Sequence, residues 1–451
     1  MIIVRAGKKT TCMHDQLMTF VPPRRCFASE IRYCALLDNR ATRDYIAAGR
    51  SPHATGASQA FDGRPQRNTD GGDTVMPANI QQGTFMTFET VGIIGAGTMG
   101  AGIATSLAAE GVSVVLVDQS QEAVDRAIAG AGKFYARGVE KGRMSEAAAS
   151  AATARLSGGT ALEAVAACDL VIEAVFEETG IKAELYARLN PILSDTAVVA
   201  TNTSCLKVSE LAEGYKDPRR FLGLHYFNPA AINPIVEVVR GEKTDPALFD
   251  QALEFCRATG KKPLACADSY GFALNRFFVP YANEAVRLLD EGVGTAAQID
   301  RVAQECLGVA AGPFLVTNLV KPRIMYHALS HLSPHGPFYA LAGTLAERGD
   351  TDYEFEIGED APGNADADAV IADRLRAAAF FPVLQELDEQ VASPADIDMG
   401  AGAALRFGKP PCALMDELGR DEVARIVAVV TEGYGQAMPA SLERVGALRA
   451  Q

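Results

Sequence analysis

The chain has 451 residues, enough for about three domains at roughly 150 residues each, and its 56 acidic and 42 basic side chains give a net charge of −14. Such an acidic surface disfavours nucleic acids and anionic membranes as partners, and no apolar run reaches the roughly 18 residues that a membrane span needs. Because the nine cysteines lack the spacing of metal ligands, we expect reduced thiols, no metal site and a cytoplasmic protein of enzyme size.

Residues 1–85 differ from the rest of the chain. They carry 11 basic and 7 acidic side chains, a net charge of +4, and residues 50–83 are rich in Gly, Pro, Asn, Asp, Gln and Thr. Transit peptides are basic but poor in acidic residues, so seven acids speak against one. We interpret residues 1–85 as a disordered or non-native extension that takes no part in the function.

Short β-branched runs alternate with alanine-rich helical runs over residues 86–268, and the β-rich runs stop after about Asp245, where long helical stretches take over. The expected strands are residues 91–95, 112–118, 169–175, 197–200, 220–225 and 234–239. Strands that alternate with helices predict a doubly wound parallel sheet with helices on both faces. We therefore expect a Rossmann-type α/β domain over residues 86–268, followed by an all-α region.

The all-α region contains an internal repeat. Residues 275–314 align with residues 373–412 without gaps, with 11 identities in 40 positions. Such a repeat predicts two tandem helical domains, residues 269–348 and 373–451. Between them, residues 349–372 are acidic and contain no Lys or Arg, as is typical of a solvated linker.

A Gly-Ala-Gly-Thr-Met-Gly segment follows the first expected strand and opens a helix. In such a turn Gly95 permits the sharp bend, Gly97 lets a pyrophosphate approach the backbone, and Gly100 packs the helix on the sheet. The contacts expected to bind the cofactor here are Gly95, Gly97, Thr98, Met99 and Gly100. Asp118 ends the next strand, where its carboxylate can bind a ribose diol and repel a 2′-phosphate, so we expect NAD rather than NADP.

A second group of polar residues follows the later strands. Ser204 comes after one expected strand, His225 ends the next, and Glu237 lies 12 residues further on, near the end of the following strand. Since ligands bind at the carboxyl ends of parallel strands, we expect these side chains to converge. An imidazole oriented by a carboxylate can take the hydroxyl proton of an alcohol while the carbon that bears this hydroxyl loses a hydride. Alternatively, His225 is a core histidine and Glu237 a surface charge.

These motifs, with the Gly-Phe-Ala-Leu-Asn-Arg-Phe segment at residues 271–277, resemble the L-3-hydroxyacyl-CoA dehydrogenase family in order and spacing. The likeness covers about residues 87–314, and the second helical domain resembles that of longer members. The resemblance implies NAD-dependent oxidation of an L-3-hydroxyacyl-CoA to a 3-ketoacyl-CoA, as in fatty-acid β-oxidation. Butanoate and aromatic-acid pathways and the acyl chain length stay open.

The resemblance also implies roles for single residues. His225 is the expected general base and Glu237 its orienting partner. Ser204 would hydrogen-bond the substrate hydroxyl and Asn275 would help to hold the substrate, while Ser204 and Asn228 would lie beside the nicotinamide. The second helical copy would replace the partner of a dimer, which leaves a monomer with an internal pseudo-dimer or a homodimer.

Further positions match the family or depart from it. Glu177 and Lys182 fall at positions that contact the cofactor, and Lys141 at one that meets the CoA nucleotide. Phe134 stands where the family has a CoA-contacting Ser, and Cys205 where it often has a second Ser. These departures concern the contacts to the acyl-CoA and not the reaction at C3.

Three histidines lie close together at residues 327, 331 and 335, and Pro334 should end their helix before the last of them. No carboxylate or cysteine accompanies them at a useful spacing, so we expect a polar helix face rather than a metal site. Two other functions remain open for the whole chain. One is a dehydrogenase of a free hydroxy acid or sugar acid, and the other is a catalytically silent NAD-binding scaffold.

Overall fold

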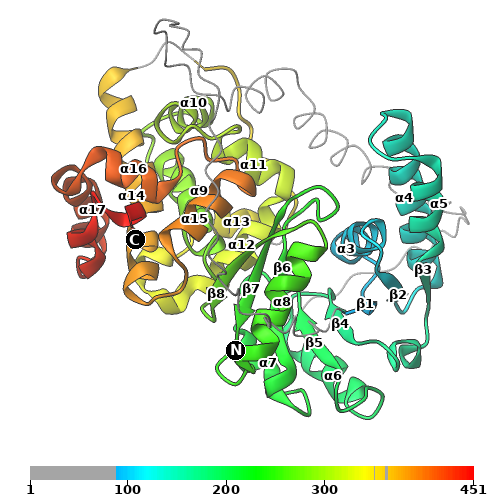
Figure 1. Cartoon of the computed structure of the whole chain (residues 1–451). Helices are drawn as coiled ribbons and strands as arrows, with labels where there is room; N and C mark the ends of the chain where they lie inside the picture. Colours follow the sequence, from blue (N-terminus) through cyan, green and yellow to red (C-terminus); the bar gives the residue numbers. More distant parts are fainter. Residues whose placement is uncertain (1–87, 350, 361–363, 451) are drawn as a thin grey trace, which may run out of the picture. The chain divides into compact units, whose positions relative to one another are not determined.

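The computed structural model describes residues 88–349, 351–360 and 364–450 (Figure 1). The extension predicted over residues 1–85 lies outside the described residues. Within them, no helix combines the length and the apolar character that crossing a bilayer requires. The six cysteines in this part of the chain are buried free thiols.

Eight strands form one sheet in the described part of the chain, in the order β3-β2-β1-β4-β5-β6-β7-β8 (Figure 1). They are β1 (Thr90–Ile94), β2 (Ser113–Val117), β3 (Leu156–Gly159), β4 (Leu170–Glu173), β5 (Val198–Thr201), β6 (Phe221–Tyr226), β7 (Ile235–Arg240) and β8 (Lys262–Ala267). All neighbours pair in parallel except β6 and β7, which are antiparallel.

Helices cover both faces of this sheet. They are α3 (Thr98–Ala109), α4 (Gln121–Glu140), α5 (Glu146–Ala154), α6 (Thr179–Leu189), α7 (Val208–Ala212) and α8 (Pro246–Ala258). Successive residues of β4 point to opposite faces, so that Leu170 and Ile172 pack with α3 and α8, whereas Val171 packs with α6 and α7. The predicted doubly wound α/β domain is therefore confirmed.

Two strands and one strand direction differ from the sequence-based expectation. Strand β3 was not expected, and β8 shows that strands continue after Asp245. Both lie at edges of the sheet, where the sequences Leu-Ser-Gly-Gly and Lys-Pro-Leu-Ala-Cys-Ala lack β-branched residues. Pro263 is tolerated in β8 because an edge strand needs fewer backbone N–H donors. The antiparallel direction of β7 also corrects the expected all-parallel sheet.

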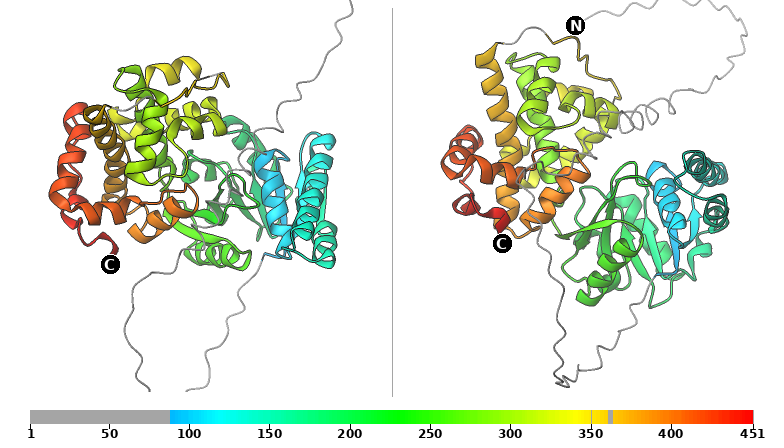
Figure 2. Two further views of the ribbon diagram at one scale, coloured as in Figure 1. Left: turned by 90° about the horizontal axis from the view of Figure 1, so that it is seen from above. Right: turned by 45° about the horizontal axis from the view of Figure 1, so that its top comes forward.

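The remaining described residues form the predicted helical region (Figure 2). Its α-helices are α9 (Asn275–Asp290), α10 (Ala296–Leu307), α11 (Pro313–Val320), α12 (Pro322–Leu332), α13 (Gly343–Arg348), α14 (Ala365–Asp388), α15 (Pro394–Ala403), α16 (Pro411–Leu418) and α17 (Arg420–Tyr434). Short 3-10 turns in the described chain are η1 (Leu162–Val165), η2 (Pro218–Arg220), η3 (Ser333–His335), η4 (Pro337–Tyr339), η5 (Ala440–Arg444) and η6 (Leu448–Ala450).

Helix α14 begins at Ala365, inside the segment expected to be a linker. Part of that acidic segment binds α10, because Arg301 forms ion pairs with Asp360 at 2.6 Å and with Asp368 at 2.9 Å. The acidic side chains are therefore not all solvated. Some of them fasten the start of α14 to the first repeat, residues 275–314.

One pair of hydrogen bonds recurs at equivalent positions of the first repeat and the second repeat (residues 373–412). Asp300 accepts hydrogen bonds from two first-turn N–H groups of α11, at 2.8 and 3.1 Å. Asp398, its equivalent in the second repeat, accepts from two first-turn N–H groups of α16, at 2.8 and 2.9 Å. A carboxylate at a helix N-terminus accepts hydrogen bonds from N–H groups that lack partners within the helix. The equivalent helices of the two repeats are therefore capped in the same way.

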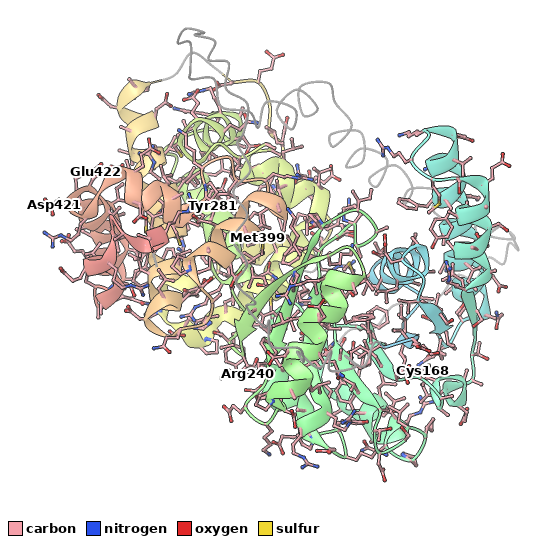
Figure 3. The ribbon with its side chains drawn as sticks, viewed as in Figure 1. Cys168, Arg240, Tyr281, Met399, Asp421 and Glu422 are labelled. Atoms are coloured by element: carbon pink, nitrogen blue, oxygen red, sulfur yellow. The ribbon has the colours of Figure 1, made fainter. Side chains whose placement is uncertain are left out.

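The two repeats contact each other symmetrically. Val309 and Phe407, which are equivalent positions, pair with each other in an antiparallel bridge. The ring of Tyr281, labelled in Figure 3, packs edge-on against Phe407 with centroids 5.6 Å apart. An antiparallel bridge between two equivalent residues places a twofold axis between them, so the two repeats are related by an approximate twofold.

Candidate active site

The glycine-rich turn between β1 and α3 has the geometry expected of a pyrophosphate site. Gly95 has a φ of +107°, and a Cβ on it would lie 2.4 Å from the carbonyl oxygen of Ala174. A Cβ on Gly100 would overlap the carbonyl oxygen of Gly95, so helix and turn are in direct contact. Around Gly97, in contrast, a Cβ would meet no atom within 4 Å. The exposed Gly97 and Thr98 thus leave the N-terminus of α3 open to an anion.

Asp118 is fixed beside this turn. Its Oδ2 accepts a hydrogen bond from the backbone N–H of Ala96 at 2.7 Å, and its Oδ1 accepts one from Ser120 at 3.0 Å. The carboxylate therefore joins the glycine-rich turn to the start of α4. This position, after β2 and next to the turn, fits a dinucleotide whose ribose diol lies at the end of the second strand.

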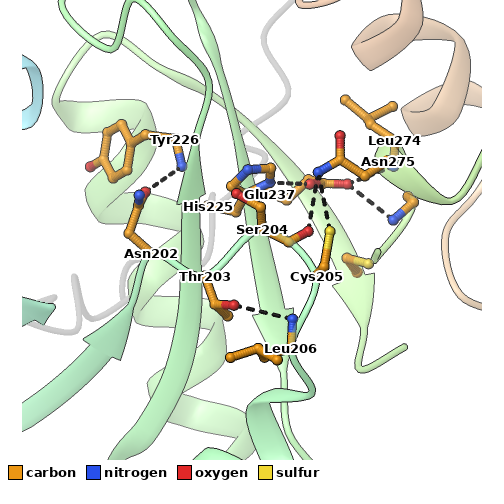
Figure 4. Close-up of polar contacts among 12 residues, drawn as sticks. Asn202, Thr203, Ser204, Cys205, Leu206, His225, Tyr226, Glu237, Leu274 and Asn275 are labelled. Atoms are coloured by element: carbon orange, nitrogen blue, oxygen red, sulfur yellow. Dashed lines mark hydrogen bonds and ion pairs between the residues drawn. The ribbon is translucent and has the colours of Figure 1, made fainter. Parts of the chain in front are cut away.

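A buried histidine–carboxylate pair lies on β6 and β7 (Figure 4). His225 stands directly opposite Glu237 in the antiparallel register, and its Nδ1 lies 2.6 Å from Oε2 of the carboxylate. Only 4% of His225 and none of Glu237 is exposed to solvent. Glu237 is the third residue of β7, not near its end as expected. The two side chains meet as a cross-strand pair rather than at the ends of parallel strands.

The second carboxylate oxygen of Glu237 is also hydrogen-bonded. Oε1 accepts from the backbone N–H groups of Ala273 at 3.0 Å and Leu274 at 2.8 Å (Figure 4). These groups belong to the turn between β8 and α9. Both oxygens of a fully buried carboxylate are thus satisfied, which fixes its plane and presents one oxygen to His225.

Ser204 and Asn275 lie next to this pair. Asn275, the first residue of α9, donates from Nδ2 to the carbonyl oxygen of Ser204 at 3.1 Å, and its Nδ2 lies 4.0 Å from Sγ of Cys205 (Figure 4). Both Ser204 and Asn275 are partly exposed. The structure therefore brings together all four side chains predicted for catalysis.

Glu177 and Lys182 hold the loop that carries Ser204. Glu177 Oε1 accepts from the hydroxyl of Thr203 at 2.6 Å and from the backbone N–H of Ser204 at 2.7 Å. Lys182 Nζ lies 3.2 Å from Oε2 of Glu177 and 2.7 Å from Oε1 of Glu173. Burial opposes both charges, yet the neighbouring ions and hydrogen bonds lower the pKa of Glu177 and raise that of Lys182.

Glu173 is a buried residue of the site that the sequence analysis missed. Besides Lys182, its carboxylate accepts hydrogen bonds from the hydroxyls of Tyr186 at 2.7 Å and Thr201 at 2.8 Å. The signal in the sequence is an acidic residue at the end of the apolar run Leu-Val-Ile-Glu. A fully buried acid needs partners, so such a residue marks a polar network.

Lys182→Met should lower the free energy of unfolding by about 3 kcal/mol, since it leaves the fully buried carboxylate of Glu173 without its cation. Urea denaturation of the variant and the wild type measures this loss. Lys243→Met is the matched control, because Lys243 and its partner Glu213 are more than half exposed, and it should cost less than about 1 kcal/mol. Equal losses in the two variants would contradict a buried network.

Comparison with known proteins agrees with this arrangement. Residues 90–269 match the family model described as 3-hydroxyacyl-CoA dehydrogenase, NAD binding domain, and residues 271–351 match the C-terminal domain of the same family. A probable 3-hydroxyacyl-CoA dehydrogenase from Caenorhabditis elegans is 37% identical over 236 residues, which cover 51% of this chain and 76% of that protein. The chain belongs to the 3-hydroxyacyl-CoA dehydrogenase family.

Other members of the family are similar over different lengths. The 3-hydroxyadipyl-CoA dehydrogenase of Escherichia coli is 38% identical over 236 residues, and the match covers 52% of this chain but half the length of that relative. A 3-hydroxybutyryl-CoA dehydrogenase structure from E. coli K12 shares the fold, with a TM-score of 0.71 and 24% identity over 81% of this chain and 99% of that one.

An (S)-3-hydroxybutyryl-CoA dehydrogenase from Ralstonia eutropha has a TM-score of 0.56 and 32% identity over 58% of this chain and 93% of that one. Together with the family models, these relatives confirm the predicted family and its NAD-binding domain.

Two residues expected to contact ligands in this family member lie outside the hydrogen-bonded cluster. Asn228 is exposed in the loop after β6, and Lys141 is the C-terminal cap of α4. Neither residue hydrogen-bonds the His225–Glu237 pair. In contrast, Glu177 and Lys182 belong to the hydrogen-bonded network that holds the loop of Ser204.

The three histidines of the α12 region do not form a metal centre with acidic or sulfur ligands. Helix α12 ends at Leu332, and His335 lies in η3 after Pro334. Nε2 of His335 is 2.9 Å from the carbonyl oxygen of Tyr270, and burial, together with the charge of Arg276, lowers the pKa of His335 to about 4. Among the described residues, no group of three or more His, Cys, Asp or Glu side chains could hold a metal ion.

Proposed function

We propose that this protein oxidises an L-3-hydroxyacyl-CoA to the 3-ketoacyl-CoA with NAD, as the names of its relatives suggest. The observation that carries this proposal is the buried His225–Glu237 pair, 2.6 Å apart, beside Ser204 and Asn275. A silent scaffold would have no need of a buried ionisable pair with every carboxylate oxygen satisfied. The family and the geometry therefore support one reaction.

His225 and Glu237 have different roles in the removal of the proton. His225 Nε2 takes the proton of the C3 hydroxyl, while the C3 hydrogen leaves as hydride and the C–O bond becomes a carbonyl. NAD supplies the hydride acceptor. Glu237 keeps the proton of the imidazole on Nδ1, which leaves Nε2 unprotonated before the step, and it stabilises the imidazolium afterwards. Among the described residues, Nε2 of His225 has no hydrogen-bond partner.

The residues around the glycine-rich turn fit NAD. The pyrophosphate would lie at the N-terminus of α3, against the backbone at Gly97, Thr98 and Met99. Asp118 would accept hydrogen bonds from the ribose diol, and its charge disfavours a 2′-phosphate. Asn228 and Ser204 would border the nicotinamide, and Glu177 and Lys182 would hold that edge of the site in place.

Asp118→Asn should reduce the preference for NADH over NADPH by at least about tenfold, because it removes the negative charge and keeps the shape of the side chain. Fluorescence titration of both dinucleotides against variant and wild type measures the two affinities. Thermal unfolding of the variant controls for loss of the hydrogen bonds to Ala96 and Ser120. An unchanged ratio of the two affinities would contradict the assigned role of Asp118.

The substrate would be held by side chains of both parts of the chain. Ser204 would donate to the C3 oxygen, and Asn275 at the start of α9 would help to fix the acyl group, which together would select the L alcohol. Lys141 would meet the phosphates of the CoA nucleotide. The approximate twofold of the helical region supports two domains, residues 269–348 and 373–451, that form an internal pseudo-dimer with one active site per chain.

Forward assays with NAD test the proposed substrate class. L-3-hydroxybutyryl-CoA should be oxidised rapidly, whereas D-3-hydroxybutyryl-CoA and free L-3-hydroxybutyrate should react at least about a hundredfold more slowly, since they lack the correct hand or the CoA contacts. Comparable rates with the free acid would instead favour a dehydrogenase of free hydroxy acids.

A further inference from the structure

The turn that hydrogen-bonds Glu237 has an unusual backbone conformation. Gly271 and Phe272 are consecutive residues with φ values of +77° and +52°. Phe272 is not a glycine, so its left-handed conformation persists only if the surroundings hold it. The N–H groups of the next two residues are those that donate to Glu237. Whatever holds this turn therefore also orients the carboxylate that faces His225.

Arg276 holds the turn from within. Its backbone N–H donates to the carbonyl oxygen of Gly271 at 3.1 Å, and its guanidinium donates from Nη1 to the hydroxyl of Ser269 at 3.1 Å. The side chain is completely buried. A buried guanidinium requires a counter-ion, because its desolvation is otherwise uncompensated.

The counter-ion comes from the second repeat. Glu389 accepts two hydrogen bonds from Arg276, at 2.5 and 2.6 Å, in a bidentate pair. Two further contacts join the second repeat to the same region: Ala267 of β8 donates to the carbonyl oxygen of Val391 at 2.8 Å, and a Cβ on Gly400 would lie 2.7 Å from a methyl of Leu274. The second repeat thus supports both ends of the turn.

We infer that Glu389 is a positioning residue for the His225–Glu237 pair, which it reaches through Arg276 and the N–H groups of Ala273 and Leu274. This inference rests on the proposed function and adds to it a role for the second repeat. Glu389 touches no reacting atom, so it acts on the rate only by fixing the orientation of Glu237. The active site is then incomplete without the second repeat.

The approximate twofold provides a matched control. Arg374, the equivalent of Arg276, binds Glu291, the equivalent of Glu389. The side chains of Glu291 and Glu389 are both 50% exposed. The Arg374 pair contacts neither Glu237 nor the turn that holds it. Arg374 also pairs with Glu284, so Glu291→Gln removes one ion pair of the same type, leaves that guanidinium with a counter-ion and does not touch the support of the dyad.

The test compares Glu389→Gln with Glu291→Gln and the wild type in the reduction of acetoacetyl-CoA by NADH. We expect Glu389→Gln to lower kcat at least about tenfold with NADH affinity and KM within about twofold, and Glu291→Gln to keep kcat within about twofold. Glu291→Gln should lose less thermal stability than Glu389→Gln, because Arg374 keeps its ion pair with Glu284. Equal kcat values in the two variants would overturn the inference.

A second readout is independent of turnover. With 15N-labelled histidine, the proton between His225 Nδ1 and Glu237 gives an NMR signal, which should shift or broaden in Glu389→Gln and stay in place in Glu291→Gln. An unchanged signal in Glu389→Gln would overturn the inference. If the wild type does not reduce acetoacetyl-CoA, the proposed function fails, whereas the NMR comparison still decides the role of Glu389.

Ser269→Ala tests the same inference if Glu389→Gln does not fold. It removes only the hydroxyl that accepts from Arg276, so a folded protein is expected. Its kcat should fall at least about threefold and its histidine signal should move in the same direction. A folded Ser269→Ala variant with wild-type kcat and an unmoved signal would count against the coupling.

Discussion

His225→Ala should lower kcat for acetoacetyl-CoA reduction at least about 100-fold, the usual scale for loss of a general acid–base group. The imidazole supplies the proton to the forming hydroxyl in this direction and removes it in the other. No other imidazole hydrogen-bonds Glu237 among the described residues, so no second group of this kind is held in its place. Steady-state kinetics at saturating NADH measure the change.

The control for this variant is His225→Gln. Its amide can still donate a hydrogen bond to Glu237 and fill the buried space, so the fold and the NADH affinity should be kept while kcat stays low. A His225→Gln or His225→Ala protein that binds NADH normally and loses less than about tenfold in kcat would refute the assignment of His225 as the base.

Glu237→Gln should lower kcat by about 100-fold to 10,000-fold, the upper figure being the effect of the corresponding change in a Ser-His-Asp triad. The carbonyl oxygen of the new amide can still accept from Ala273 and Leu274, so its NH2 group must face His225. The Nδ1 atom then has to accept a hydrogen bond, which places the imidazole proton on Nε2 and removes the base.

Substrate binding should survive this change, because Glu237 is fully buried behind the imidazole. The KM for acetoacetyl-CoA and the Kd for NADH should therefore remain within about threefold of the wild type. Glu237→Asp is the control, because it keeps the negative charge on a shorter side chain. It should retain more activity than Glu237→Gln if Glu237 acts mainly by fixing the tautomer of His225. A large rise in KM with unchanged kcat would argue that Glu237 binds ligand instead.

The sequence predicts most strands of the sheet because the central ones are apolar on both faces. Strands β1, β2 and β4 to β7 carry dense runs of Val, Ile and Leu between Ala-rich helices. The edge strands β3 and β8 need less apolar surface and so leave a weak pattern. Strand direction did leave a signal that the sequence analysis missed: the eight residues between β6 and β7 are too few for the crossover that a parallel pair needs, so this short connection indicates an antiparallel pair.

In the candidate site, the residues that belong to local sequence motifs could be predicted, whereas the contacts between distant residues could not. The motifs around Gly95, Ser204 and His225 are local, and their residue types point to the chemistry. The spacing of 12 residues to Glu237 does not reveal that it faces His225 across two strands. Arg276 and Glu389 are 113 positions apart, and their pairing depends on the packing of the two repeats, for which no local pattern exists.

The most direct test of the account is the absorbance of NADH with purified protein and a series of 3-ketoacyl-CoAs, beginning with acetoacetyl-CoA. We predict rapid oxidation of NADH, with a ranking of rates by chain length that identifies the preferred acyl group. Tight binding of NADH without oxidation by any thioester in the series would contradict the account: the dinucleotide-binding fold would stand, and the acyl-CoA substrate would have to be discarded.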